Sequence, residues 1–340
     1  MESLRQEIKK WSDAVKSDSQ NLRIVDTVYF GGGTPNLLGV KKIAEVLNLI
    51  KMDFTLADDV EITLEVNPTK FGKIDFARLK EAGVNRLSVG MQSANDKELK
   101  LLGRTHNKQA TEYTVKDAQR AGFENISLDL MVCTPGQTKA SLLKSIDFCE
   151  KLKIQHISAY LLKLEKGTEY YLNKDKLDLK DENTQSEIYL FVCEELEKRG
   201  FHQYEISNFS TPNSQSKHNL KYWNAEEYIG IGPSAHSFLN GKRFFYANSL
   251  NEFINNPKTI DDGLGGDIKE YAMLQLRLSD GLRNTRFYEK FGVNIPQRYF
   301  HRAKLYEKYN LVKVSKDGFH LTKKGNLVSN SLIYKIIYDE

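Results

Sequence analysis

The feature that most constrains this chain is a repeated unit of amphipathic helix, turn and short β-rich run. The predicted helices cover 43–51, 75–82, 108–121, 141–152 and 184–199, and the predicted strands 61–66, 86–89, 126–131, 156–162 and 203–207. In three units a glycine directly follows the helix, as expected where a left-handed residue ends it. This alternation predicts βαβ units and a parallel sheet. Five such units favour a full or partial barrel, whose chemistry gathers at the C-terminal strand ends.

The sequence changes character after about residue 240. Residues 241–267 are expected to be rich in loops, and helical patterns follow across 268–310. Two short β-rich runs are then joined by Asp317-Gly318, a strong hairpin signal, and a last helix is predicted over 324–337. The expected organisation is a partial barrel over 1–240, a linker over 241–267 and a small winged-helix-like domain over 268–340.

Composition and charge exclude several classes of protein. The 340 residues are 40% hydrophobic and 28% charged, as in a soluble globular protein. A formal net charge of +4 gives no support for nucleic-acid binding. No apolar stretch is long enough to span a bilayer, and the first residues, MESLRQEIKKW, lack the apolar core of a secretory signal. A cytoplasmic protein is therefore expected.

Three cysteines occur, at Cys133, Cys149 and Cys193. They are too few and too widely spaced for a disulfide framework, a metal knuckle or an iron–sulfur loop. Cys149 and Cys193 fall within helical patterns beside apolar residues. We expect both to be small buried hydrophobic side chains.

Polar residues follow four successive predicted strands. The run TVYFGGGTPNLL, residues 27–38, ends a β-rich segment in three glycines, which let a backbone approach a ligand closely. The other polar residues at these strand ends are Glu65, Gln92, Arg104 and Asp129. Each alone is also explained as a tight turn or a structural hydrogen bonder. Four at equivalent places favour a site for a polar ligand.

These motifs carry a family resemblance. YFGGGTP, EVNP, SVGMQS, LGRTH and DLM…PGQT, in this order, resemble the radical SAM proteins related to oxygen-independent coproporphyrinogen III oxidase. HNLKYWN at 218–224 is similar to the HNxxYW signature of HemW-type heme chaperones, and EYIGIGPSAHSF at 227–238 resembles the segment that follows it. The resemblance covers nearly the whole chain. It implies a radical-SAM-type (β/α) barrel.

The resemblance also implies ligands for particular residues. Gly32, Gly33 and Thr34 match the loop that holds the methionine amino group of S-adenosylmethionine. The other polar contacts that the family makes with S-adenosylmethionine match Glu65, Gln92, Arg104 and Asp129. His236 matches the position where the family's backbone passes the adenine of this cofactor. Heme is the second implied ligand: His218 would offer an imidazole to the iron, with Tyr222 and Trp223 beside the macrocycle. The alternative for His218 is a turn histidine next to two core aromatic rings.

The chain departs from the family in two places. The family opens with a strand and a CxxxCxxC loop that holds a [4Fe–4S] cluster, whereas this sequence opens with what resembles the following helix. Without those thiolates we expect no cluster, and hence no electron source for cleaving S-adenosylmethionine. The barrel is expected to lack its first strand and to leave the strand near 24–30 with an unpaired edge. The second departure is Cys133-Thr134, where the family usually has Gly-Leu.

Three functions follow from these features. The first is a heme-binding chaperone that delivers heme to respiratory proteins, with contact with a membrane surface during delivery. The second is a radical SAM enzyme that decarboxylates coproporphyrinogen III in porphyrin biosynthesis, against which the missing cysteines count. The third is a winged-helix regulator on DNA, which the scattered basic residues Arg302, Lys323 and Lys324 support least.

Overall fold

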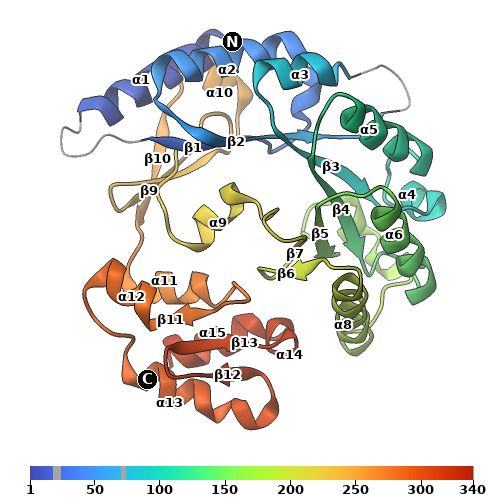
Figure 1. Cartoon of the computed structure of the whole chain (residues 1–340), viewed down its shortest axis with the longest axis vertical. Coiled ribbons are helices and arrows are strands. Elements are labelled where there is room, and N and C mark those ends of the chain that lie inside the picture. Colours follow the sequence, from blue (N-terminus) through green and yellow to red (C-terminus); the bar gives the residue numbers. More distant parts are fainter. Residues whose placement is uncertain (18–23, 70–73, 340) are drawn as a thin grey trace. The chain divides into compact units, whose positions relative to one another are not determined.

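The computed structural model describes residues 1–17, 24–69 and 74–339 (Figure 1). The chain divides into two compact units, each assembled from distant segments. The first contains Met1–Glu65, Asp75–Arg86 and Ser216–Leu274, and the second contains Val66–Ile74, Leu87–Gln215 and Gln275–Glu340.

Two parallel strands and their helices form the first part of the first unit. Strand β1 (Val25–Phe30) pairs with β2 (Leu56–Val66) through the crossover helix α2 (Val40–Asp53). Helix α1 (Glu2–Ser17) lies beside α2, and α3 (Phe76–Ala82) follows β2 (Figure 1). Ile8 of α1 packs with Val46 and Leu49 of α2 and with Phe30 of β1. The apolar stripe of each helix is thus buried against its neighbour.

The first unit also contains a three-stranded antiparallel sheet of β8 (His236–Leu239), β9 (Lys242–Tyr246) and β10 (Thr259–Leu264), with α10 (Leu250–Asn255) between β9 and β10. Trp11 of α1 stacks on Phe244, and its indole N–H donates to Tyr246 Oη at 2.8 Å. The expectation that 241–267 is rich in loops was therefore wrong. These strands are only four, five and six residues long, which gave too little periodicity to be detected. The division of the chain at 240 and 267 stays a prediction.

The second unit repeats the strand–helix alternation. Strand β3 (Arg86–Gln92) begins at the end of a first-unit segment, and β4 (Asn125–Val132) pairs in parallel with β5 (His156–Leu161). The helices of this part are α4 (Asp96–Leu101), α5 (Lys108–Arg120), α6 (Lys139–Lys151), α7 (Glu169–Leu172) and α8 (Glu182–Lys198). Leu128, Leu130 and Ile157 are fully buried, which explains the apolar character of these strands.

The strand predicted over 203–207 is different in the structure. It is replaced by two short strands, β6 (His202–Gln203) and β7 (Asn208–Ser210), and β7 runs antiparallel to β5. Only four residues join β6 and β7, and so short a connection joins antiparallel neighbours, so the two form a hairpin. Strand β7 lies between β6 and β5 in the sheet and runs antiparallel to both. The last unit of the repeat therefore ends the parallel order.

The C-terminal part of the second unit is winged-helix-like. A small antiparallel sheet in the order β11 (Leu282–Arg283), β13 (Gly318–Leu321), β12 (Val312–Val314) packs with the helices α12 (Asn284–Phe291), α13 (Gln297–Leu305), α14 (Lys323–Leu327) and α15 (Ser329–Ile337). The predicted hairpin around Asp317-Gly318 is confirmed between β12 and β13. The structure thus has the predicted α/β class with a small C-terminal domain. No helix of its described residues is long and apolar enough to cross a membrane.

Candidate functional site

Polar side chains share one face of the β1–β2 pair in the first unit. The parallel register places Thr27 beside Glu61 and Tyr29 beside Thr63. Because side chains alternate between faces along a strand, Glu65 of β2 lies on this same face. Helix α9 (Lys217–Trp223), which carries the HNLKYWN motif, packs against it. We call this polar surface together with α9 the α9 face.

The N-terminus of α9 is fixed by two oxygen-bearing side chains. Ser216 precedes the helix and accepts a hydrogen bond from the Asn219 N–H at 3.3 Å. The Glu61 carboxylate accepts from the backbone N–H groups of Lys217 and His218, at 3.1 and 3.0 Å. A carboxylate there also complements the positive end of the helix dipole. The motif therefore forms a short helix anchored on β2, where a turn was the alternative expectation. The heme-ligand role of His218 stays a prediction.

His218 is held on three sides of its ring. Its Nδ1 lies 2.8 Å from Thr27 Oγ1, and its Nε2 lies 2.8 Å from Tyr222 Oη, one helical turn further on. The ring of Tyr29 stacks on it, with centroids 4.9 Å apart and 23° between planes. The Tyr222 ring meets it edge-on, at 5.1 Å and 86°.

The charge state of His218 follows from these surroundings. Burial, together with the positive charges of Lys221 and Arg86, lowers the pKa of His218 to about 4, against a smaller opposite effect of Asp26. Lys221 is itself paired with Asp26 at 2.7 Å and with Glu226 at 2.8 Å. At neutral pH the imidazole is therefore uncharged, the form that binds a metal.

The glycine turn after β1 lies next to Glu65. The Gly32 N–H donates to Glu65 Oε2 at 3.2 Å, and the Tyr29 hydroxyl donates to Oε1 at 2.9 Å. A Cβ on Gly31 would lie 2.5 Å from the Tyr29 ring and 2.8 Å from Glu65 Oε1, whereas one on Gly32 or Gly33 would meet nothing within 4 Å. Burial raises the pKa of Glu65, although these two hydrogen bonds lower it.

This geometry fits part of the predicted S-adenosylmethionine site. The carboxylate of Glu65 lies beside the open backbone of Gly32 and Gly33. An amino-acid ammonium group needs acceptor oxygens and close backbone approach of this kind. Thr34 follows directly and is half-buried. His236 is the exposed first residue of β8 in the same unit, and its ring stacks on Phe245 at 4.9 Å.

The remaining predicted residues belong to the second unit. Gln92 is the buried last residue of β3, with a φ of 65° that non-glycine residues rarely adopt. Arg104 lies exposed in the loop after α4. Asp129, in the middle of β4, accepts from the Ser88 hydroxyl at 3.3 Å. Gln92 thus lies at the end of its strand and Asp129 within its strand, which are the places that the sequence predicted for them.

A buried polar row in the second unit was not predicted. The register pairs Ser127 with His156 and Asp129 with Ser158, so these side chains share one face of β4 and β5. Ser127 Oγ lies 2.7 Å from His156 Nδ1, and Nε2 of that ring lies 2.9 Å from the hydroxyl of Tyr204.

Glu205 lies one residue beyond Tyr204. It is 1% exposed, and burial raises its pKa to about 7, although hydrogen bonds from Ser207 and Asn208 lower it. The sequence indicated the burial of Glu205 only weakly, because Glu205 lies in the loop between the short strands β6 and β7.

The cysteines do not fit an iron–sulfur cluster. Cys133, Cys149 and Cys193 are all buried, and burial raises the pKa of Cys133 to about 11 and those of Cys149 and Cys193 to about 12. A cluster needs several thiolates close together. Among the described residues, no group of three His, Cys, Asp or Glu side chains could hold a metal ion.

The second departure from the family, at Cys133, falls on an unusual backbone conformation. Its φ is 63°, in the left-handed region where glycine is favoured. A glycine at this position, which is usual in the family, would adopt this φ without strain, whereas the cysteine here adopts it at some cost.

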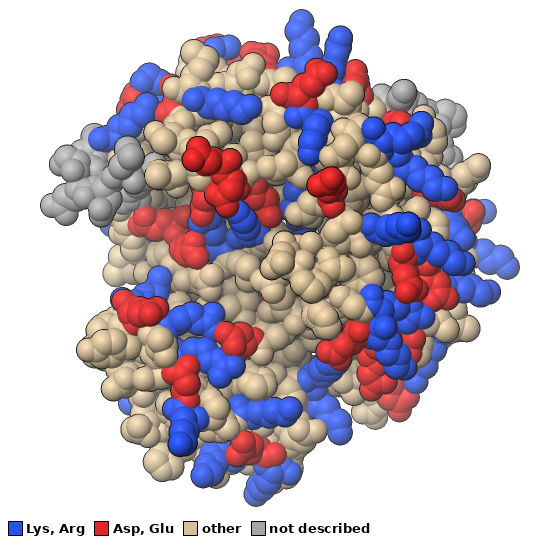
Figure 2. Space-filling view, viewed as in Figure 1, with Lys and Arg blue, Asp and Glu red and all other residues tan. Residues whose placement is uncertain are grey.

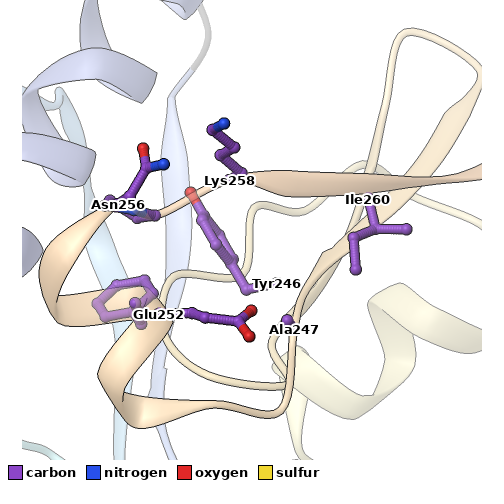
Figure 3. A pocket seen from close by; sticks show the side chains of 8 residues that line it. Tyr246, Ala247, Glu252, Asn256, Lys258 and Ile260 are labelled. Atoms are coloured by element: carbon purple, nitrogen blue, oxygen red, sulfur yellow. The ribbon is translucent and has the colours of Figure 1, made fainter.

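The surface offers no large single-sign patch on the face shown in Figure 2, where Lys and Arg side chains are interspersed with Asp and Glu. A small pocket of about 230 Å³ lies in the first unit. Figure 3 shows its lining residues, among them Tyr246, Glu252 and Lys258. None of the predicted ligand residues lines it. Its volume is below that of most sites for larger organic ligands.

Comparison with known proteins places this geometry in a class. Residues 6–149 match the family model of the Radical SAM superfamily, and residues 267–328 match that of the HemN C-terminal domain. The structure of coproporphyrinogen III oxidase (HemN) from Escherichia coli, a radical SAM enzyme, superposes with a TM-score of 0.80 at 19% identity, over 99% of this chain and 82% of that one. The fold is thus a partial radical-SAM-type (β/α) barrel with a winged-helix-like C-terminal domain.

Curated relatives narrow the class. The chain is 34% identical to the heme chaperone HemW of Bacillus subtilis, over 90% of this chain and 84% of the relative. It is 30% identical to the heme chaperone HemW of Lactococcus lactis, over 98% and 91%. A mitochondrial radical S-adenosyl methionine domain-containing protein 1 of Danio rerio is 41% identical, over 67% and 52%. The chain therefore belongs to the HemW family of radical SAM proteins.

Proposed function

We propose that this protein is a heme-binding chaperone that takes up heme at the α9 face and transfers it to heme-accepting respiratory proteins. The observation that carries the proposal is the neutral, half-buried imidazole of His218, which lies beside the rings of Tyr29 and Tyr222. A neutral imidazole is a common ligand of heme iron, and aromatic rings favour contact with a flat apolar macrocycle. Contact with a membrane surface during delivery belongs to the same proposal.

Titration with ferric heme tests the uptake step. The protein should give a defined Soret shift, and His218→Ala should weaken binding and alter that spectrum. His301→Ala is the matched control, because His301 lies exposed on α13. Its described hydrogen bond is to the Gln297 carbonyl of the same helix. Cooperative thermal unfolding of both variants excludes heme binding by partly unfolded protein. A folded His218→Ala protein with the parent spectrum and affinity would contradict the proposal.

We propose further that S-adenosylmethionine binds weakly at the glycine turn. Glu65 and the backbone of Gly32, Gly33 and Thr34 would hold its amino-acid end, with Gln92, Arg104, Asp129 and His236 the other contacts that the resemblance implies. A bound [4Fe–4S] cluster would supply the electron for cleaving this cofactor, but the cysteines of this chain do not fit one. The α9 face, which needs no cluster, therefore favours the chaperone over the coproporphyrinogen oxidase alternative.

A further inference from the structure

His218 is held at both ring nitrogens by hydroxyl groups from different elements. Thr27 reaches Nδ1 from β1, and Tyr222 reaches Nε2 from α9, each at 2.8 Å. A neutral imidazole has one N–H donor and one acceptor nitrogen, so one of these hydroxyls accepts and the other donates. The two possible tautomers differ in which nitrogen has a lone pair available for a metal.

The chemistry of the two hydroxyls decides between the tautomers. A phenol is more acidic than an aliphatic alcohol, so Tyr222 is the stronger donor and Thr27 the stronger acceptor. The favoured arrangement has the His218 Nδ1–H donating to Thr27 Oγ1 and the Tyr222 O–H donating to Nε2. Metal-binding histidines are commonly oriented in this way, by donation from the nitrogen that does not bind the metal.

We propose that Thr27 fixes the tautomer and orientation of His218 that leave Nε2 for iron, and that the Tyr222 hydroxyl caps Nε2 until heme displaces it. This inference rests on the proposed heme-binding function and assigns two positioning residues to it. Iron binding at Nε2 replaces the hydrogen bond from Tyr222 by an Fe–N bond. No proton is transferred, because Tyr222 keeps its hydroxyl proton and the His218 Nδ1 keeps its N–H proton. The iron keeps its oxidation state, because the Fe–N bond uses the lone pair of Nε2.

The two hydroxyls differ in their freedom to move. Thr27 is 9% exposed, and its backbone is fixed in the parallel pairing of β1 with β2. Tyr222 is 40% exposed, and its described ring contacts are edge-on ones, to His218 and to Tyr228 at 4.6 Å. Thr27 is therefore the fixed support and Tyr222 the removable cap.

Two single-group deletions should have opposite effects. Tyr222→Phe keeps the ring but removes the cap, so ferric heme should bind about fivefold more tightly, the factor corresponding to one net hydrogen bond. The gain should lie in the association rate, because the fraction of protein competent to bind increases while the Fe–N bond is unchanged. Thr27→Val should weaken heme binding by about tenfold or more and alter the Soret band. Thr27→Ser keeps the hydroxyl, so it should have the heme affinity and the Soret band of the parent protein.

The experiment is a stopped-flow and equilibrium titration of the full chain with ferric heme. Tyr228→Phe is the matched control for Tyr222→Phe, since the Tyr228 hydroxyl lies 3.4 Å from Arg243 in the first unit and has no described contact with His218. It should leave the rate and spectrum unchanged. Cooperative thermal unfolding should accompany each variant.

The outcomes distinguish failure of the cap alone from failure of the proposed heme site. If Tyr222→Phe binds no faster than the parent, or Thr27→Val matches Thr27→Ser, the assigned roles are wrong, although heme binding at His218 stands. If Tyr222→Phe loses the iron-ligand spectrum while His218→Ala retains it, Tyr222 is itself the iron ligand and the cap is refuted. If His218→Ala leaves the parent spectrum and affinity intact, the proposed heme site fails together with its positioning residues.

Discussion

Replacing Glu205 by Gln should stabilise the protein strongly at pH 8 and only slightly at pH 5. The carboxyl is 1% exposed, and its Oε1 is buried without a hydrogen-bond partner among the described residues. Burial raises the pKa of Glu205 from 4.5 to about 7. Between these two values the folded state binds the proton and the unfolded state does not, so this carboxyl lowers stability as the pH rises from 4.5 to 7.

The magnitude follows from the two pKa values of Glu205. The carboxylate should cost the folded state about 3 kcal/mol at pH 8 and about 1 kcal/mol at pH 5, at about 1.4 kcal/mol per unit of pKa. Gln has the same shape and no charge, so Glu205→Gln should recover these amounts. The measurement is the free energy of unfolding in urea at both pH values.

Glu194→Gln provides the matched control. Glu194 is exposed on α8, so the same loss of charge should change stability by less than about 0.5 kcal/mol at either pH. The opposite view is that Glu205 stabilises Arg277, whose pKa is lowered by burial and raised in part by the charge of Glu205. A loss of stability in Glu205→Gln at pH 8, or an equal gain at both pH values, would refute our reasoning.

Four further predictions concern the first unit and the cysteines. Gly31→Ala should destabilise the protein by about 1–3 kcal/mol, because its Cβ would overlap Tyr29 and Glu65, whereas Gly33→Ala should change stability by less than about 0.5 kcal/mol in urea unfolding. The pKa of His218 is lowered from 6.5 to about 4, so the folded protein should lose stability as the pH falls through this window, and His218→Gln should show less of that slope. Anaerobic reconstitution should leave almost no bound iron, since the three cysteines are buried and belong to no metal-binding group of three side chains among the described residues; about four irons per chain would contradict this. Calorimetry should detect only weak binding of S-adenosylmethionine, weakened further by Glu65→Ala, and we expect this binding to be unproductive; 5′-deoxyadenosine formation by the purified chain would contradict that.

The expected unpaired edge at residues 24–30 has a structural counterpart. In the described part of the chain, β1 has β2 as its one paired strand, and Ile24 beside it is 53% exposed. Packing of α9 covers the polar face of β1 through Thr27 and Tyr29 but leaves that edge without a strand partner. The prediction of an open edge is therefore confirmed for the described residues.

The sequence alone determined the parts of this protein that local periodicity and short motifs encode. The helix over 108–121 and the strand over 126–131 were predicted to within a residue or two of α5 and β4, because both patterns are long and regular. The motif YFGGGTP indicated the glycine turn after β1, because glycine allows a tight backbone turn. The helix that carries HNLKYWN was not predicted from the sequence.

Only the tertiary structure decided which side chains meet. Thr27 and His218 are 191 residues apart in sequence, and their contact depends on the register of β1 with β2 and on the capping of α9 by Glu61. No local pattern encodes such a pairing, because it arises when distant segments pack around one core. The antiparallel direction of β7 and the burial of Glu205 were likewise decided by packing, which determines the solvent exposure and hence the pKa of each group.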